Sequence, residues 1–117
     1  MASDPEFVEY IKEQLAPLPV SSARMFSGTG FSAHGVQFAM LIRNVLYFVV
    51  DDETRPRYEA WGSECFSYET KKRRVNVRRY YSVPADALED RDRLVELARA
   101  AIAIARRSPA PAARRKA

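Results

Sequence analysis

The sequence is poor in the residue types that build disulfides and metal centres. Its 117 residues include one cysteine, Cys65, and one histidine, His34. A single cysteine cannot form an internal disulfide, which fits a reducing compartment. One histidine and one cysteine also cannot supply the three or four ligands of a typical zinc site. We therefore predict a protein without a disulfide, a metal ion or a bound cofactor.

Long apolar runs and targeting signals are missing as well. The longest apolar runs, 45–50 and 100–105, have six residues each. A membrane-spanning helix needs about 20 apolar residues, so neither run can cross a bilayer. The first residues, Met-Ala-Ser-Asp-Pro-Glu, have neither the basic nor the apolar region of a signal peptide. These absences predict a cytoplasmic protein that does not contact a membrane.

Charge of one sign is lacking over most of the chain. The formal net charge is +4, but residues 108–117 hold three basic side chains and no acid, which leaves +1 for residues 1–107. The high isoelectric point therefore reflects the end of the chain and does not indicate a DNA-binding body. We expect one domain over 1–107 and a disordered, basic tail rich in proline and alanine over 108–117.

The stretch from Arg24 to Val50 organises the predicted fold. Two turn signals, His34-Gly35 and Arg43-Asn44, divide it into three short antiparallel strands. The third of these strands, 45–50, is apolar on both sides, whereas a half-solvated antiparallel strand normally alternates. Since the chain has few helices to cover two faces, we predict a homodimer that buries the face without helices.

The rest of the chain completes an α+β pattern. Ser3 and Glu6 have the spacing of a capping box, and apolar residues follow at helical spacing up to Pro17. The further expected elements are a short helix over 53–61, strands over 65–69 and 75–83, and a helix that ends at residue 107. The predicted order is α-β-β-β-α-β-β-α, with one five-stranded antiparallel sheet and three helices. In the last strand, alternation places five side chains on one face: Val75, Val77, Arg79, Tyr81 and Val83.

Two features resemble chemical sites but have simpler interpretations. Gly28 and Gly30 lack the third glycine or the Gly-Lys-Ser/Thr ending of a phosphate loop, so they indicate a bulge or a close backbone approach. A catalytic cysteine needs a neighbouring base, and nothing in the sequence pairs Cys65 with His34. We interpret Cys65 as a small buried residue and His34 as a turn residue. No catalytic constellation is visible, and we expect no enzymatic activity.

The strongest candidate for a functional site is a basic hairpin over residues 71–79. Its nucleic-acid-binding candidates are Lys71, Lys72, Arg73, Arg74, Arg78 and Tyr80. Basic side chains contact phosphates and an adjacent aromatic ring can stack on a base. The alternative is a solvated hairpin whose charges discourage edge-to-edge aggregation of the sheet.

Several segments, read in order, resemble a known family. They are Arg24-Met-Phe-Ser-Gly-Thr-Gly-Phe, Val45-Leu-Tyr-Phe-Val-Val-Asp, the segment 57–68 and Tyr80-Tyr-Ser-Val-Pro. The chain resembles the TfoX N-terminal domain family, also called the Sxy family of competence regulators, from about residue 7 to residue 107. Three positions depart from the family pattern: Ser27 and Asn44 replace glycines, and Cys65 replaces a proline.

The resemblance implies a bacterial regulatory role and no catalytic residues. Full-length regulators of this family carry a second, C-terminal domain, so the resemblance implies a stand-alone N-terminal module here. Those regulators help the cAMP receptor protein to activate competence genes, which makes a transcription factor one expected kind of protein partner. We expect an accessory or regulatory module that acts through protein–protein contact. The alternative is a nucleic-acid-binding module that uses the 71–79 hairpin.

The tail generates the first prediction. Removing residues 108–117 should leave the melting temperature nearly unchanged, because the tail offers little apolar surface to bury. Thermal unfolding of the full chain and of a chain that ends at Arg107 measures this. A drop of several degrees in the shorter chain would show that the tail docks on the domain.

Overall fold

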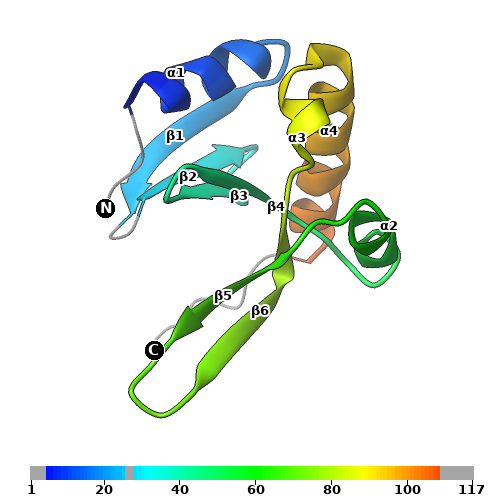
Figure 1. The fold of residues 1–117 in the computed structure, drawn as a ribbon. Coiled ribbons are helices and arrows are strands. Elements are labelled where there is room, and N and C mark those ends of the chain that lie inside the picture. The colour runs from blue at the N-terminus through cyan, green and yellow to red at the C-terminus, as the bar shows by residue number, and fades with distance from the viewer. Residues whose placement is uncertain (1–4, 26–27, 109–117) are drawn as a thin grey trace.

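The computed structural model of the protein describes residues 5–25 and 28–108. Its helices are α1 (Pro5–Gln14), α2 (Arg55–Ala60), α3 (Ala85–Leu88) and α4 (Arg91–Arg107). Its strands are β1 (Val20–Met25), β2 (Gly28–Ala33), β3 (Val36–Ile42), β4 (Val45–Val49), β5 (Cys65–Glu69) and β6 (Arg74–Ser82). Within the described residues the strands form one antiparallel sheet in the order β1-β2-β3-β4-β6-β5 (Figure 1).

Both predicted tight turns are confirmed. His34 and Gly35 have φ angles of 54° and 80°, and Arg43 and Asn44 have φ angles of 54° and 64°. Positive φ at both central residues is the geometry that matches the twist of two hairpin strands. These turns place β2, β3 and β4 side by side in a meander.

The α+β class is confirmed, but the predicted count of elements is wrong. The described residues form six strands and four helices, not five and three. The extra strand is β1, whose small residues Ser21, Ser22 and Ala23 carry no strand pattern but pair along the edge of the sheet with β2. The extra helix is α3, one turn that precedes α4. Ser3 of the expected capping box and the tail beyond residue 108 lie outside the described residues.

All four helices contribute to one hydrophobic core against the same face of the sheet, which we call the helix side. α4 crosses β3 and β4, and α1 packs beside α4 (Figure 1). The largest buried side chains of this core are Ile11, Leu15, Phe31, Phe38, Leu41, Leu46, Phe48 and Leu94. The opposite face, which we call the open side, has no helix among the described residues.

A register shift in β3 changes which residues face the core. Phe31 pairs with Ala39 and Ser32 with Gln37, so Phe38 is an extra residue between them. Phe38 and Ala39 both enter the core, and the Phe38 ring lies 5.8 Å from the Phe48 ring. Strict alternation of faces is interrupted along this strand, because a bulge inserts one residue without a partner.

A larger shift in β6 corrects a second prediction. Cys65 pairs with Tyr81, whereas the next residue, Phe66, pairs with Val77. Residues 78–80 of β6 therefore have no partner in β5. Because this number is odd, the side chains of β6 change faces across the insertion, so Val77 and Tyr81 point to opposite sides of the sheet. Tyr81 joins the core on the helix side, whereas Val77 lies with Phe66 on the open side. Val75, Val77, Tyr81 and Val83 do not share one face.

Asp51 joins the end of β4 to both neighbouring helices. Its Oδ1 atom accepts hydrogen bonds from the backbone N–H groups of Thr54, at 2.9 Å, and Glu53, at 3.0 Å. Its Oδ2 atom lies 3.1 Å from Arg107 Nη2 at the end of α4. Burial acts to raise the pKa of Asp51, but these hydrogen bonds and the charge of Arg107 outweigh it and hold the pKa below its ordinary value.

Asp51→Ala should lower the free energy of unfolding by about 1 kcal/mol near neutral pH. Because the folded-state pKa is depressed, this stabilisation exists above the unfolded pKa of about 3.9 and disappears as the pH falls through the folded value. Urea unfolding at about pH 7 and about pH 3 measures it. Asp52→Ala is the control, since that carboxylate is exposed and pairs only with Arg55. An equally large loss of unfolding free energy in Asp51→Ala at about pH 3 would contradict the inference that the ionised Asp51 carboxylate stabilises the fold.

Candidate functional site

The β5–β6 hairpin projects beyond the main sheet (Figure 1). β4 pairs only with residues 80–82 of β6, so residues 65–69 and 74–77 form a ribbon of two strands. An isolated ribbon of two strands is marginally stable in water, because it has few neighbours to pack against. The projecting hairpin is thus the part of the described fold that would be stabilised most by packing against another molecule.

Apolar side chains line the open side of this hairpin. The Tyr47 and Phe66 rings meet edge to face at 5.1 Å, and the Phe66 and Tyr68 rings lie 6.2 Å apart. Tyr68 is 48% exposed. We call this set the hairpin stripe; its members are Tyr47, Phe66, Tyr68, Val75 and Val77. None of them belongs to the hydrophobic core.

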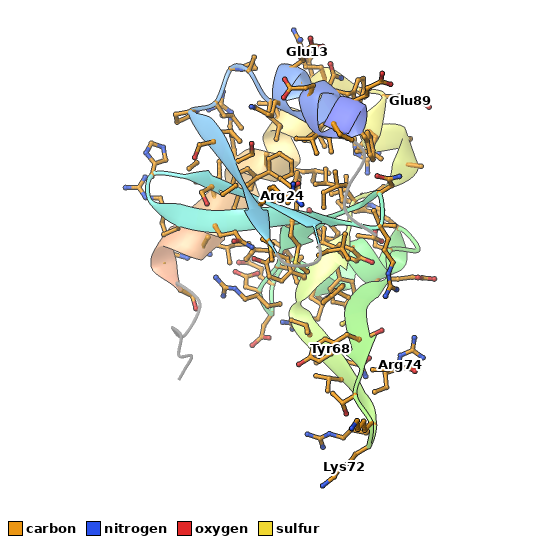
Figure 2. The ribbon with its side chains drawn as sticks, turned by 90° about the vertical axis from the view of Figure 1, so that its left-hand side faces the viewer. Glu13, Arg24, Tyr68, Lys72, Arg74 and Glu89 are labelled. Atoms are coloured by element: carbon orange, nitrogen blue, oxygen red, sulfur yellow. The ribbon has the colours of Figure 1, made fainter. Side chains whose placement is uncertain are left out.

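Four of the six predicted basic-site residues gather at the hairpin tip. The Thr70 hydroxyl accepts hydrogen bonds from the backbone N–H groups of Lys72 and Arg73, each at 3.2 Å, and so fixes the turn. The side chains of residues 71–74 are all exposed (Figure 2). Arg74 Nε donates to Ser67 Oγ at 3.1 Å, on the side of the ribbon opposite the hairpin stripe. The tip is a solvated positive charge with a defined backbone.

The other two predicted residues lie elsewhere. Arg78 sits at the base of the hairpin, where its carbonyl accepts a hydrogen bond from Arg55 Nε at 3.1 Å. Tyr80 is six residues from Arg74, or about 20 Å along an extended strand. It is half-buried on the open side of the main sheet. Tyr80 therefore cannot stack on a base that is held by the tip.

Tyr80 belongs to a polar group on the open side that the sequence reasoning missed. The Tyr80 hydroxyl accepts a hydrogen bond from Gln37 Nε2 at 3.2 Å. A Cβ atom on Gly30 would lie 2.8 Å from Gln37 Oε1 and 3.0 Å from Met25 Sδ, so the glycine leaves the space in which these side chains lie. The prediction of a close approach is confirmed at Gly30. Gln37, a polar residue within an apolar strand, was the available signal.

Cys65 and His34 lie in separate parts of the sheet. His34 is exposed in the turn between β2 and β3, and two strands, β4 and β6, separate β3 from β5. Burial raises the pKa of the half-buried Cys65 thiol, and its Sγ atom donates to the Phe66 carbonyl at 3.4 Å. A raised pKa disfavours the thiolate, which is the nucleophilic form of cysteine.

Residues 5–25 and 28–108 contain no group of three or more histidine, cysteine, aspartate or glutamate residues arranged to hold a metal ion. No helix within those ranges combines the length and apolar character needed to cross a bilayer.

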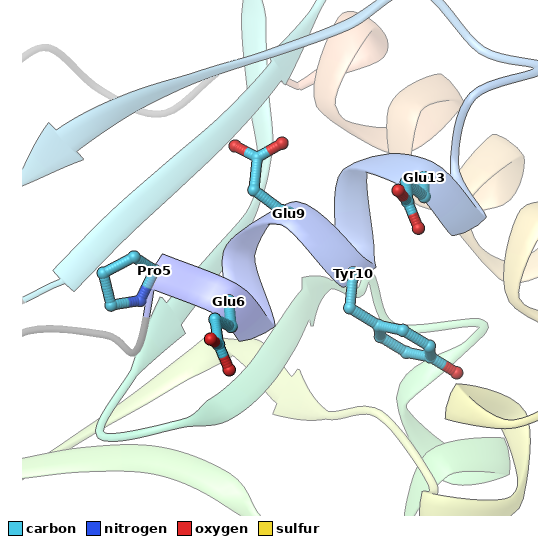
Figure 3. Close-up of a pocket in the computed structure, with 5 residues that line it drawn as sticks. All are labelled: Pro5, Glu6, Glu9, Tyr10 and Glu13. Atoms are coloured by element: carbon cyan, nitrogen blue, oxygen red, sulfur yellow. The ribbon is translucent and has the colours of Figure 1, made fainter.

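Negative charge collects at the end of the molecule away from the hairpin tip. An open hollow of about 390 Å³ on α1 is lined by Pro5, Glu6, Glu9, Tyr10 and Glu13 (Figure 3). Tyr10 donates to the Leu88 carbonyl at 2.6 Å, and Lys12 lies 3.7 Å from Glu9. Figure 2 shows Glu13 and Glu89 at the opposite end from Lys72 and Arg74. The exposed acids are solvated surface charges at one pole of the domain.

The comparison with known proteins concerns nearly the whole described domain. A family model described as the TfoX N-terminal domain matches residues 13–105. The match extends from within α1 almost to the end of α4, so it includes the hairpin, its tip and the open side of the sheet. A search of curated proteins found no match.

Proposed function

Because the chain belongs to the TfoX N-terminal domain family, we propose that it is a non-enzymatic regulatory module that acts through protein–protein contact in the cytoplasm. The observation that supports this proposal is the hairpin stripe on a ribbon that projects from the sheet. The family associates the module with competence or transcription regulation. A transcription factor is therefore the expected kind of regulated partner.

The composition of the hairpin stripe is typical of an interface. Tyrosine and phenylalanine are enriched at the centres of protein interfaces, where they bury large areas with few rotatable bonds. Nearby Val45 is 40% exposed and extends the apolar surface towards the turn between β3 and β4. Exposed apolar side chains that adjoin one another, rather than being scattered singly, mark binding surfaces.

The partner proposed for the hairpin stripe is a second copy of the chain. Two ribbons of two strands that face each other about a two-fold axis would bury both stripes and compensate for the marginal stability of each. The basic tips lie beyond the stripes and would remain in solvent. Strand 45–50, from which a homodimer was predicted, contributes Tyr47 to this stripe, whereas its Val49 and Val50 are already buried within one chain.

Light scattering at micromolar concentration should give a mass about twice the 13.3 kDa of one chain. Val77→Lys should shift the mass to that of the monomer, because a charge without a partner would be buried in the interface. Asn76→Lys is the matched control: it adds the same charge to the neighbouring exposed position, on the other side of β6, and should leave the dimer intact. A wild-type monomer, or equal effects of the two variants, would contradict the dimer.

The hairpin tip supports a second candidate function, nucleic-acid binding. Four consecutive basic residues, 71–74, are exposed at a turn of fixed backbone. Such a cluster neutralises phosphates, and the counterions released give a steep dependence of affinity on salt. Tyr80, the aromatic candidate named from the sequence, is not beside the tip, so it cannot stack on a base that the tip holds.

A chain that ends at Arg107 should bind a single- or double-stranded oligonucleotide no tighter than about 10⁻⁴ to 10⁻⁶ M at physiological salt, the usual non-specific range. Using this chain removes Arg114, Arg115 and Lys116, which would otherwise mimic the tip. Fluorescence anisotropy at several salt concentrations measures the affinity. Sub-micromolar, salt-sensitive binding that Lys72→Ala, Arg73→Ala and Arg74→Ala together abolish would favour the second candidate instead.

A further inference from the structure

Strand β5 forms one outer edge of the sheet. It stands last in the order β1-β2-β3-β4-β6-β5, so no described strand pairs with its outer side. Natural edge strands are commonly protected from further pairing by proline, lysine or a bulge. β5 reads Cys-Phe-Ser-Tyr-Glu, without proline or lysine, and its register shift lies at the first step, which leaves residues 66–69 regular. This outer edge is therefore open to a further strand.

The register of the hairpin determines which backbone groups point outwards. Thr70 N donates to Arg73 O at 2.8 Å, so these two residues form a hydrogen-bonded pair. In an antiparallel ladder such pairs alternate with pairs that are not hydrogen-bonded. The N–H and C=O groups of Ser67 and Glu69 therefore point away from β6. Two residues thus present two donors and two acceptors to a neighbouring strand.

The two faces of β5 differ in chemical character at this edge. On the open side, an added strand would lie beside Phe66 and Tyr68 of the hairpin stripe. On the other side it would lie beside Ser67, whose hydroxyl accepts from Arg74 Nε at 3.1 Å. Arg74 is exposed and takes part in none of the ion pairs between described residues, so its charge and further N–H donors are available to a partner.

The other outer edge of the sheet, that of β1, offers less to a partner. The central residues of β1 are Ser21, Ser22 and Ala23, which have no large apolar surface. When a strand is added to a sheet, the backbone hydrogen bonds provide affinity and the alternate side chains provide specificity. Of the two edges in the described sheet, β5 is the one that places aromatic side chains on one face and a basic side chain on the other.

We propose that the outer edge of β5 receives an extended segment of the regulated protein in antiparallel pairing. The segment alternates apolar and polar residues and carries one aspartate or glutamate opposite Ser67. Its carboxylate would lie within reach of Arg74, because side chains directly opposite on paired strands are about 5 Å apart. An acid opposite Glu69 would be repelled, so the single acid also sets the register.

This proposal rests on the proposed function and extends it. In the proposed homodimer the second copy occupies the hairpin stripe, which lies on one face of the ribbon, and the regulated protein has no assigned position. Pairing along the edge of β5 uses backbone groups that the second copy does not need. The apolar residues of the segment would continue the buried surface outwards from the stripe.

The test is an NMR titration of the full-length protein with a short peptide. The probe is N-acetylated, C-amidated Thr-Val-Glu-Val-Thr, in which valine and threonine favour an extended backbone. In the proposed register its glutamate exchanges two hydrogen bonds with Ser67. The amide proton signals of Ser67 and Glu69 should shift downfield to saturation. Those of Phe66 and Tyr68, whose N–H groups face β6, should shift less.

Methylation of single peptide nitrogens tests the edge pairing itself. In the proposed register the glutamate N–H points towards β5 and the two valine N–H groups point away from it. Methylation of the glutamate nitrogen should weaken binding about tenfold, because it removes a donor and places a methyl group against β5. Methylation of either valine nitrogen is the matched control and should change the affinity less than about twofold.

A matched pair of variants makes the same test from the side of the protein. Proline is tolerated in an edge strand where its position faces solvent, so Glu69→Pro removes an outward N–H while the pairing of β5 with β6 persists. It should weaken peptide binding about tenfold. Glu69→Ala removes the same carboxylate but keeps the N–H, and it should not weaken binding. Cross-strand contacts between Tyr68 and Val75 in the NMR spectrum verify that the hairpin remains folded.

A second pair of variants tests the acid opposite Ser67. Arg74→Met should weaken binding of the glutamate peptide about two- to fivefold, the usual effect of an exposed ion pair. It should leave binding of a peptide with glutamine in place of glutamate unchanged. Lys72→Met is the control, because it removes the same charge from an exposed position at the hairpin tip and should affect both peptides equally.

Four results would overturn the proposal. They are no shift at Ser67 and Glu69, equal losses from methylation at the glutamate and valine nitrogens, shifts confined to Tyr47 and Val77 of the stripe, and concentration-dependent shifts of the Ser67 and Glu69 amides without peptide. The last result would assign the edge to a second copy. The titration does not require a dimer: a confirmed dimer that fails to bind the peptide would reject the edge site alone, and a monomer that binds it would reject the dimer alone.

Discussion

The fold depends on strand β6, which pairs with two neighbouring strands. β6 pairs with β4 through residues 80–82 and with β5 through most of its length, and between these two pairings its register shifts opposite the step from Cys65 to Phe66. The shift lets Tyr81 enter the core while Val77 faces the other way. A regular strand would instead have carried one apolar face throughout, and the hairpin would have had no exposed stripe.

The functional proposals follow from this change of side. All four helices contribute to the core on the helix side, so an apolar residue on the opposite face can be buried only by sheet side chains or by another molecule. On the main sheet, Met40 is buried on this face, next to the polar group of Gln37 and Tyr80. On the projecting hairpin nothing equivalent covers Tyr68, which is 48% exposed. An exposed apolar stripe of this kind is a surface suited to a protein partner that presents apolar side chains.

Local signals in the sequence predicted much of the fold, and long-range ones were missed. The turns at His34-Gly35 and Arg43-Asn44 depend on neighbouring residues and were predicted. β1 was missed because its pairing with β2, rather than its own residues, makes it a strand. The shifts in β3 and β6 were missed because period-two alternation assumes no extra residue. The basic tip was visible as a run of like charges, whereas the hydrogen bond from Gln37 to Tyr80 depends on the folded sheet.

The central claim, that β6 turns over between its two halves, can be measured in the folded protein without a partner. A soluble paramagnetic agent broadens the methyl NMR signals of residues that face solvent, and Tyr68→Lys, which places a charge in the hairpin stripe, keeps the dilute protein monomeric. The structure predicts strong broadening at Val75 and Val77 and protection at Val83, which is buried on the helix side. Equal protection of all three valines in the dilute monomer would mean that they share one buried face, and it would contradict the register shift and the open side built on it.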